Sequence, residues 1–160
     1  MRSTRTYTLI TAPLISAALL GLAGCGFVDE PHGKPAAKPA PASSVKFADA
    51  PLGRILVDET GRTLYGFTKD KPGTNGSCDS ACIAVWPALT TAGEVTAGEG
   101  VDPALLEKTK LSEGAEQATY GGWPLYYYVG DAAGGDVNGQ GLDNEWFVIG
   151  VNGKLIKKAP

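Results

Sequence analysis

The sequence predicts a mainly β fold, a small antiparallel sandwich or barrel-like domain, for residues 47–160. Two observations lead to this prediction. Short runs of aromatic and β-branched residues, which suit the half-buried surface of a strand, are separated by glycine-containing turns. One aromatic pattern also occurs twice, which indicates two pseudo-repeats. We expect about eight short strands and one or two short helical turns, as in small sandwiches and barrels.

Two hairpins are predicted near the ends of this domain. Residues 54–58 and 62–67 are β-rich runs on either side of a turn that contains Gly61. Near the C-terminus, Asn152-Gly153 precedes residues 154–157, and Asn-Gly is a strong signal for a two-residue hairpin turn. Further strands are predicted around Tyr120 and over residues 124–129 and 146–150.

Two helical segments are predicted between the strands. Asp102 can cap a helix N-terminus and Pro103 fits the first helical position, so a short helix is expected over residues 102–108. A second helical turn is expected over residues 79–85. Both segments are short, so strands dominate the predicted fold.

An internal repeat organises the domain. Residues 64–70 and 125–131 share the pattern Leu-Tyr-x-aromatic-x-x-Asp at an offset of 61 residues. A glycine-rich segment and then a tryptophan, Trp86 or Trp146, follow each copy. The two copies predict a duplication whose halves pair pseudo-symmetrically.

The repeated motif has a structural and a functional interpretation. On a strand, its two aromatic residues project to the same face, because alternate residues share one face. The aspartate follows the strand, where its carboxylate can accept hydrogen bonds from turn amides. We interpret the motif as a repeated core-and-turn device; the alternative is an aromatic and acidic surface for a sugar, peptide or cofactor. The motif residues are Tyr65, Phe67 and Asp70 in the first copy and Tyr126, Tyr128 and Asp131 in the second.

Residues 1–24 have the organisation of an export signal. Arg2 and Arg5 give a positive start, and residues 9–22 form an apolar stretch of signal-peptide length. The following Leu22-Ala23-Gly24-Cys25 resembles the lipobox of bacterial lipoproteins. That resemblance implies cleavage before Cys25 and attachment of a diacylglyceryl group to its thiol. Acyl chains such as palmitate would then anchor the mature chain to the cell membrane, facing outside the cytoplasm. The alternative is an ordinary secretory signal with an incidental cysteine.

Residues 25–46 are rich in Pro, Ala, Ser and Lys and are expected to form an extended tether between the lipid and the domain. His32, the only histidine, lies in this tether, where we expect it to be exposed and idle. After removal of residues 1–24, 12 Lys and Arg residues face 17 Asp and Glu residues, a formal charge of −5. This charge argues against a nucleic-acid partner, because phosphate binding needs clustered basic residues.

Cys78 and Cys82 remain for the domain, and export places them in an oxidising compartment where a pair usually forms a disulfide. Their i, i+4 spacing puts both side chains on one face of a helical turn. The alternative is a thiol-redox or copper-binding pair. Copper and zinc sites usually recruit further Cys, His or Met residues, and residues 47–160 contain none beyond this pair. A structural disulfide is therefore favoured.

A glycine-rich loop near the C-terminus carries several side-chain oxygens. Asp136-x-Asn138-x-Gln140-Gly141 partly resembles a calcium loop, which places oxygen ligands at alternate residues and glycine at the sixth position. It departs from that pattern at Gln140 and at Phe147, where a bidentate glutamate belongs. No cofactor is predicted, and calcium is kept as an alternative with candidate ligands Asp136, Asn138, Gln140, Asp143 and Glu145.

The repeated motif behind a lipobox resembles the family of secreted-repeat lipoproteins of unknown function, which is described by a Yx(FWY)xxD motif. The likeness covers roughly residues 47–157 and implies a place outside the cytoplasm, without an established activity. Residues 148–153 depart from the Ser-Pro-Asp-Gly-like turn expected there. Other matching segments are Leu56-Val57-Asp58 before Gly61, Cys78-x-x-x-Cys82 before Trp86-Pro87, Gln117-x-Thr119-Tyr120-x-Gly122-x-Pro124-Leu125-Tyr126, and Gly135-Asp136-x-Asn138-Gly139-Gln140-Gly141.

No hydrolase constellation is predicted, since a Ser-His-Asp or Cys-His arrangement needs a histidine base and His32 lies outside the domain. Carboxylate chemistry stays open, although no spacing selects a pair. We therefore expect a lipid-anchored, non-catalytic module outside the cytoplasm that binds an unknown envelope protein or a small ligand. The alternative is a redox or electron-transfer accessory that uses Cys78 and Cys82 or the aromatic cluster.

Overall fold

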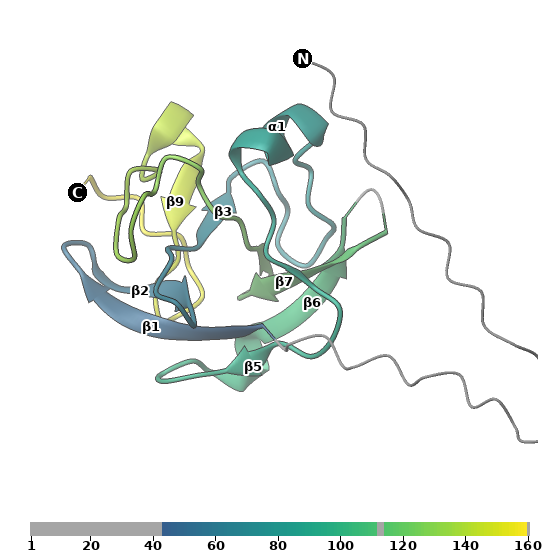
Figure 1. The fold of residues 1–160 in the computed structure, drawn as a ribbon, viewed down its shortest axis with the longest axis horizontal. Coiled ribbons are helices and arrows are strands. Elements are labelled where there is room, and N and C mark those ends of the chain that lie inside the picture. Colours follow the sequence, from purple (N-terminus) through teal and green to yellow (C-terminus); the bar gives the residue numbers. More distant parts are fainter. Residues whose placement is uncertain (1–42, 112–113, 160) are drawn as a thin grey trace, which may run out of the picture. The chain divides into compact units, whose positions relative to one another are not determined.

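Strands make up most of the regular structure, and the predicted mainly β class is confirmed. The computed structural model describes residues 43–111 and 114–159 (Figure 1). In this part of the chain the strands are β1 (Ser44–Ala50), β2 (Gly53–Asp58), β3 (Tyr65–Phe67), β4 (Thr90–Thr91), β5 (Thr96–Ala97), β6 (Leu106–Lys110), β7 (Glu116–Tyr120), β8 (Trp123–Pro124) and β9 (Trp146–Val148). The helices are α1 (Ser80–Val85) and the 3-10 helices η1 (Pro103–Leu105) and η2 (Leu142–Asn144).

The described strands form three small sheets, and none of these closes into a barrel. β1 pairs antiparallel with β2 along six residue pairs and lies parallel to β5 on its other edge. β7 pairs antiparallel with β4, β6 and β8, and β3 pairs antiparallel with β9. The parallel β1–β5 contact departs from the antiparallel prediction, and it involves only two residue pairs. In Figure 1, α1 lies at the end of the domain opposite to β1 and β5.

Two hydrophobic cores divide the buried side chains between them. β2 contributes to both, since Leu56 packs into the first core whereas its neighbours Ile55 and Val57 pack into the second. This follows from the alternation of side chains along a strand. The repeated motif obeys the same rule: the leucines Leu64 and Leu125 belong to the first core, and the adjoining tyrosines Tyr65 and Tyr126 belong to the second.

The first predicted hairpin is only partly formed. Val57 and Thr63 make one isolated bridge across the turn, whereas β2 pairs mainly with β1 and β3 pairs with β9. The longer β1–β2 ladder offers more cross-strand side-chain pairs, which are what stabilise a sheet. β1 begins at Ser44, so the sheet includes residues 44–46, which the sequence assigned to the tether.

The two helical predictions have different outcomes. The turn expected at residues 79–85 is α1, and the Asp79 carboxylate caps it by accepting a 2.9 Å hydrogen bond from the backbone N of Cys82. The helix expected at residues 102–108 is wrong beyond Leu105, because the chain continues as β6. An isolated helix of this length has little stability of its own. As a strand, the same segment forms five residue pairs with β7.

The second half of the domain has fewer long strands than predicted. The strand expected over residues 124–129 is reduced to β8 and to isolated bridges that Tyr126 makes with Tyr65 and Ala88. The strand expected over residues 146–150 ends at Val148. The C-terminal hairpin turn is confirmed, because the backbone N of Gly150 donates to the carbonyl of Lys154 at 2.9 Å across Asn152-Gly153.

Candidate functional site

Four aromatic rings from the two repeats form a continuous stack in the second core. Phe67 stacks on Trp146 with ring centroids 4.2 Å apart, and Trp146 stacks on Trp86 at 3.9 Å with their planes 2° apart. Trp86 in turn stacks on Tyr128 at 4.5 Å. We call these four residues the aromatic stack. Its first three members are buried, whereas Tyr128 is half-buried, so the stack reaches the surface at Tyr128.

Backbone pairing positions both ends of the aromatic stack. Phe67 lies directly opposite Trp146 in the β3–β9 ladder, and opposite residues on one face of a sheet contact each other. At the other end, Trp86 directly follows α1. The backbone N of Val129 donates to the carbonyl of Val85 at 3.1 Å, which brings the second copy of the motif alongside Trp86. Each stacked pair at the ends therefore joins a ring of one repeat to a ring of the other.

The motif tyrosines bind the aspartates of the opposite repeats. The backbones of Tyr65 and Tyr126 exchange two hydrogen bonds, of 2.9 and 3.0 Å. The Tyr65 hydroxyl donates to Asp131 Oδ2 at 2.8 Å. The Tyr126 hydroxyl donates to Asp70 Oδ2 at 3.0 Å. The hydrogen bonding of each motif is thus completed by the other motif.

The second oxygen of each motif aspartate holds the loop that follows its own repeat. Asp70 Oδ1 accepts hydrogen bonds from the backbone N and the hydroxyl of Ser77, at 2.6 and 2.7 Å. Asp131 Oδ1 accepts one from the backbone N of Asn138 at 3.0 Å. These bonds are the turn-amide contacts that the sequence predicts for the two carboxylates. The bond to the opposite tyrosine was not predicted.

Burial sets the protonation of these groups. It raises the pKa of the Tyr65 hydroxyl, and the Asp131 carboxylate that accepts its hydrogen bond raises it further. The pKa of the Tyr126 hydroxyl is raised in the same way by burial and by Asp70. Burial also raises the pKa of the Asp131 carboxyl. Both tyrosines therefore remain protonated donors at neutral pH.

The Cys78–Cys82 disulfide predicted from the spacing is present. It ties the loop after Asp70 to α1, and Asp79 caps the helix between the two cysteines. Cys78 is buried, with 4% of its surface exposed, whereas Cys82 is half-buried. The disulfide therefore lies at the surface end of the second core.

Two open pockets meet beside this disulfide, and both include Phe67 and Cys82. We call them together the disulfide groove. The first has a volume of about 460 Å³ and the second of about 310 Å³. The first is lined by Phe67, Lys69, Ser77, Cys78, Asp79 and Cys82, and the second by Phe67, Cys82, Val85, Trp86, Asp143, Glu145 and Trp146.

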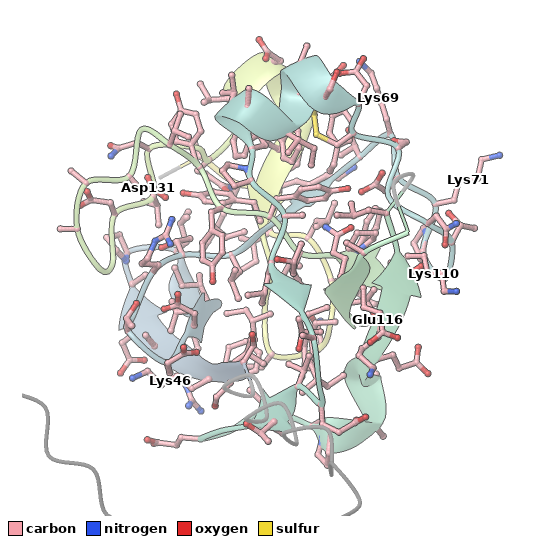
Figure 2. The ribbon with its side chains drawn as sticks, turned by 45° about the vertical axis from the view of Figure 1, so that its right-hand side comes forward. Lys46, Lys69, Lys71, Lys110, Glu116 and Asp131 are labelled. Atoms are coloured by element: carbon pink, nitrogen blue, oxygen red, sulfur yellow. A yellow bond between two sulfur atoms is a disulfide. The ribbon has the colours of Figure 1, made fainter. Side chains whose placement is uncertain are left out.

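The rim of the disulfide groove is charged and partly strained. Lys69 Nζ and Glu145 Oε1, which line different pockets of the groove, form an ion pair at 2.7 Å. Asp143 and Asn144 both adopt positive φ, at 54° and 55°, a conformation that costs energy for residues other than glycine. Figure 2 shows Lys69 close to α1 and Asp131 on the other side of the domain.

The oxygen-rich loop near the C-terminus binds mainly backbone groups. Asp136 Oδ2 accepts hydrogen bonds from the backbone N atoms of Ala132 and Ala133, both at 2.9 Å. Gln140 Oε1 accepts one from the backbone N of Val148 at 2.9 Å. Among residues 43–111 and 114–159, no three His, Cys, Asp or Glu side chains gather as a metal-binding group. Calcium binding by this loop stays a prediction.

Close packing explains why glycine is required at position 139 of this loop. The backbone N of Gly139 donates to the Tyr65 hydroxyl at 3.2 Å. A Cβ atom at Gly139 would lie 2.8 Å from Trp86 Cη2 and 2.9 Å from Tyr65 Cζ, which is closer than real contacts allow. Any larger residue would therefore separate the loop from the tyrosine and the aromatic stack.

A third tyrosine–aspartate pair was missed by sequence reasoning. The Tyr127 hydroxyl donates to Asp58 Oδ2 at 3.0 Å, and the Arg62 guanidinium lies 3.9 Å from the centre of the Tyr127 ring. Tyr127 occupies the middle position of the motif. The two copies of the motif differ at this position, because Tyr127 in the second copy corresponds to Gly66 in the first. The repeated pattern therefore did not identify Tyr127 as a functional residue.

The predicted lipid attachment at Cys25 and the lone His32 lie outside the described residues, as do residues 1–42 of the predicted signal and tether. In the part of the chain that is described, no helix combines the length and the apolar composition needed to cross a membrane.

Comparison with known proteins identifies the repeat. A family model described as a secreted repeat of unknown function matches residues 46–90 and 109–149. The two matches begin in β1 and β6 and end in β4 and just beyond β9, so each covers one half of the domain and one motif. Searches of curated proteins and of solved structures give no match. The family description implies an extracellular or envelope location. The chain therefore belongs to the family of secreted repeats of unknown function and contains two copies of the repeat.

Proposed function

We propose that this chain is a lipid-anchored module outside the cytoplasm that binds an envelope protein or a small ligand and catalyses no reaction. Membership of a secreted family supports the location. Leu22-Ala23-Gly24-Cys25 supports an anchor on Cys25, because it resembles a lipobox behind an export signal. The formal charge of −5 after residue 24 supports a partner other than nucleic acid.

The disulfide groove is the observation that carries the binding proposal. Its walls include the buried aromatic rings of Phe67, Trp86 and Trp146, and Lys69 and Glu145 add charge at the rim. Ligand sites typically combine apolar and aromatic walls with a few polar groups. Val85 adds an exposed apolar side chain to the same groove, with 43% of its surface accessible.

The chemistry of the groove supports binding rather than catalysis. Cys78 and Cys82 are joined in a disulfide, so neither supplies a nucleophilic thiolate. Lys69 and Glu145 are paired with each other. The thiol-redox alternative is not favoured at Cys78, because thiol–disulfide exchange requires access to the sulfur that is attacked and Cys78 is only 4% exposed, whereas Cys82 is half-buried.

Native mass spectrometry tests the groove as the binding site. The mature protein is extracted from membranes in mild detergent and weighed with any bound molecule retained. Val85→Glu places a charge in the groove, whereas Val129→Glu, at a position that is 59% exposed and does not line the groove, is the matched control. We expect the wild type and Val129→Glu to carry the same bound species and Val85→Glu to lose it. Equal retention by both variants would place the ligand elsewhere.

Membrane fractionation tests the anchor separately. Cys25→Ala should move the protein from the membrane fraction to the soluble fraction, because the acyl chains supply the membrane affinity. Wild-type protein recovered as a soluble species that begins at another residue would contradict the lipidation proposal.

A further inference from the structure

We propose that the buried tyrosines, tryptophans and aspartates of the two repeats form a proton-coupled path that takes up oxidising equivalents from one-electron oxidants outside the cytoplasm. This activity goes beyond the proposed binding function and does not depend on it. It uses the two tyrosine hydroxyls and their carboxylate partners, for which ligand binding in the disulfide groove gives no role.

Ring contacts provide a path for the electron. Tyr65 and Trp86 make a T-shaped contact with ring centroids 5.4 Å apart, and Tyr126 and Trp146 make one at 5.3 Å. The two indoles stack at 3.9 Å, so one connected group of rings contains both tryptophans and both tyrosines. Indole and phenol are the most easily oxidised aromatic side chains. The half-buried Tyr128, stacked on Trp86 at 4.5 Å, connects this group to the surface.

Each tyrosine also has a proton acceptor. A phenol that loses an electron becomes strongly acidic, so its oxidation is easiest where a base already accepts its hydrogen bond. Asp131 Oδ2 lies 2.8 Å from the Tyr65 hydroxyl, and Asp70 Oδ2 lies 3.0 Å from the Tyr126 hydroxyl. Because burial raises the pKa of both hydroxyls, loss of the proton before the electron is disfavoured. The carboxylate is therefore in place to take up the proton when the electron leaves the tyrosine.

The proposed reaction moves one electron and one proton among Trp86, Tyr65 and Asp131. A one-electron oxidant takes an electron from Trp86 and leaves an indole radical cation. Tyr65 then transfers an electron to Trp86 and its hydroxyl proton to Asp131. The products are a neutral indole, a Tyr65 phenoxyl radical and a neutral Asp131 carboxylic acid, and the oxidant is reduced by one electron.

The equivalent step in the other half uses Trp146, Tyr126 and Asp70, which make the corresponding contacts. The two halves share the oxidising equivalent through the stacked indoles.

Tyr120 provides a control in the first core, as a buried tyrosine outside the ring contacts of Trp86 and Trp146. It is fully buried like Tyr65 and Tyr126, and it packs against Phe47 with ring centroids 5.7 Å apart. Its hydroxyl donates to the backbone carbonyl of Val151 at 3.2 Å rather than to a carboxylate. A carbonyl oxygen is a poor base, so Tyr120 lacks the proton acceptor that the proposal requires.

Pulse radiolysis of the mature chain tests the path, with azide radicals as the one-electron oxidant. Trp123→Phe is introduced first, so that indole radicals form only on Trp86 and Trp146, the two remaining tryptophans. Transient absorption then follows the decay of the indole radical and the growth of the phenoxyl radical. We expect growth at a rate independent of protein concentration and slower in D₂O, because the transferred proton comes from an exchangeable hydroxyl.

Variants identify the proton acceptors. Tyr65→Phe combined with Tyr126→Phe keeps both rings and should lengthen the indole-radical lifetime roughly tenfold, which equals about 1.4 kcal/mol in the barrier. Asp131→Asn combined with Asp70→Asn should do the same, whereas Tyr120→Phe should leave the lifetime unchanged. An unchanged lifetime in the tyrosine double variant would overturn the proposal. The absence of a solvent isotope effect in the Trp123→Phe protein would also overturn it. That measurement leaves Tyr65, Tyr126 and their aspartates unchanged, so it does not depend on whether the variants at those positions fold.

Discussion

Replacing Trp86 by leucine should remove the centre of the second core. Trp86 is 5% exposed and contacts three rings, those of Trp146 at 3.9 Å, Tyr128 at 4.5 Å and Tyr65 at 5.4 Å. Truncation of a buried tryptophan to alanine costs about 3–5 kcal/mol, and leucine refills part of the space. Each lost aromatic pair adds about 0.5–1.5 kcal/mol. We therefore expect a loss of about 3–4 kcal/mol, which lowers the melting temperature by roughly 10–20 °C in a domain of this size.

Thermal and urea unfolding measure this loss, and Trp123→Leu is the control. Trp123 is half-buried and lies outside the aromatic stack, so its replacement should cost about 1 kcal/mol. Near-ultraviolet circular dichroism adds a second readout, because the stacked indoles of Trp86 and Trp146 should give a coupled signal that only Trp86→Leu removes. Equal costs for the two variants, with the coupled signal intact in both, would show that these rings do not stack in solution.

Three further outcomes follow from the same contacts. Cys78 and Cys82 should resist alkylation in the absence of reductant, and ready labelling of both would contradict the structural disulfide. Because the pKa of Tyr65 and Tyr126 is raised above the ordinary value of about 10, the stability that they contribute is present below pH 10 and lost as the pH rises further. Urea unfolding above about pH 10 should show a loss near 1.4 kcal/mol per pH unit for each, and the two Tyr→Phe changes should remove their share and leave that of Tyr127, whose pKa is also raised by burial and by Asp58. Calcium should leave the melting temperature unchanged, since Asp136 and Gln140 already accept backbone hydrogen bonds, and a rise of several degrees would instead establish a calcium site.

Local signals in the sequence predicted the local features of the fold. The i, i+4 cysteines lie within one turn of chain, and both the predicted helical turn and the disulfide are present there. Asn152-Gly153 sets its own turn for the same reason. Asp102 and Pro103 correctly marked a helical start, but pairing with β7 decided what followed. The capping residue therefore predicted where the helix begins but not how many residues it contains.

The crossed tyrosine–aspartate bonds could not be predicted in this way. They join residues 66 and 56 positions apart, and nothing in either motif indicates which copy completes the other. The repeat predicted that the two halves would pair, and alternation predicted that Tyr65 and Phe67 would share a core. The exchange of partners between repeats depends on the β3–β9 ladder and on the Tyr65–Tyr126 backbone bridge, which are both long-range.

A double-mutant cycle on Tyr126 shows whether the two repeats complete each other. Tyr126→Phe removes a hydroxyl that donates to Asp70 of the opposite repeat at 3.0 Å, and Asp70→Asn removes the charge of the acceptor. The coupling free energy between these changes should be about 1–2 kcal/mol, the value of a hydrogen bond to a charged group. The same cycle between Tyr126→Phe and Asp131→Asn, which lie in one repeat, should give a coupling within about 0.5 kcal/mol of zero. A larger coupling to Asp131 than to Asp70 would mean that each repeat is completed within itself.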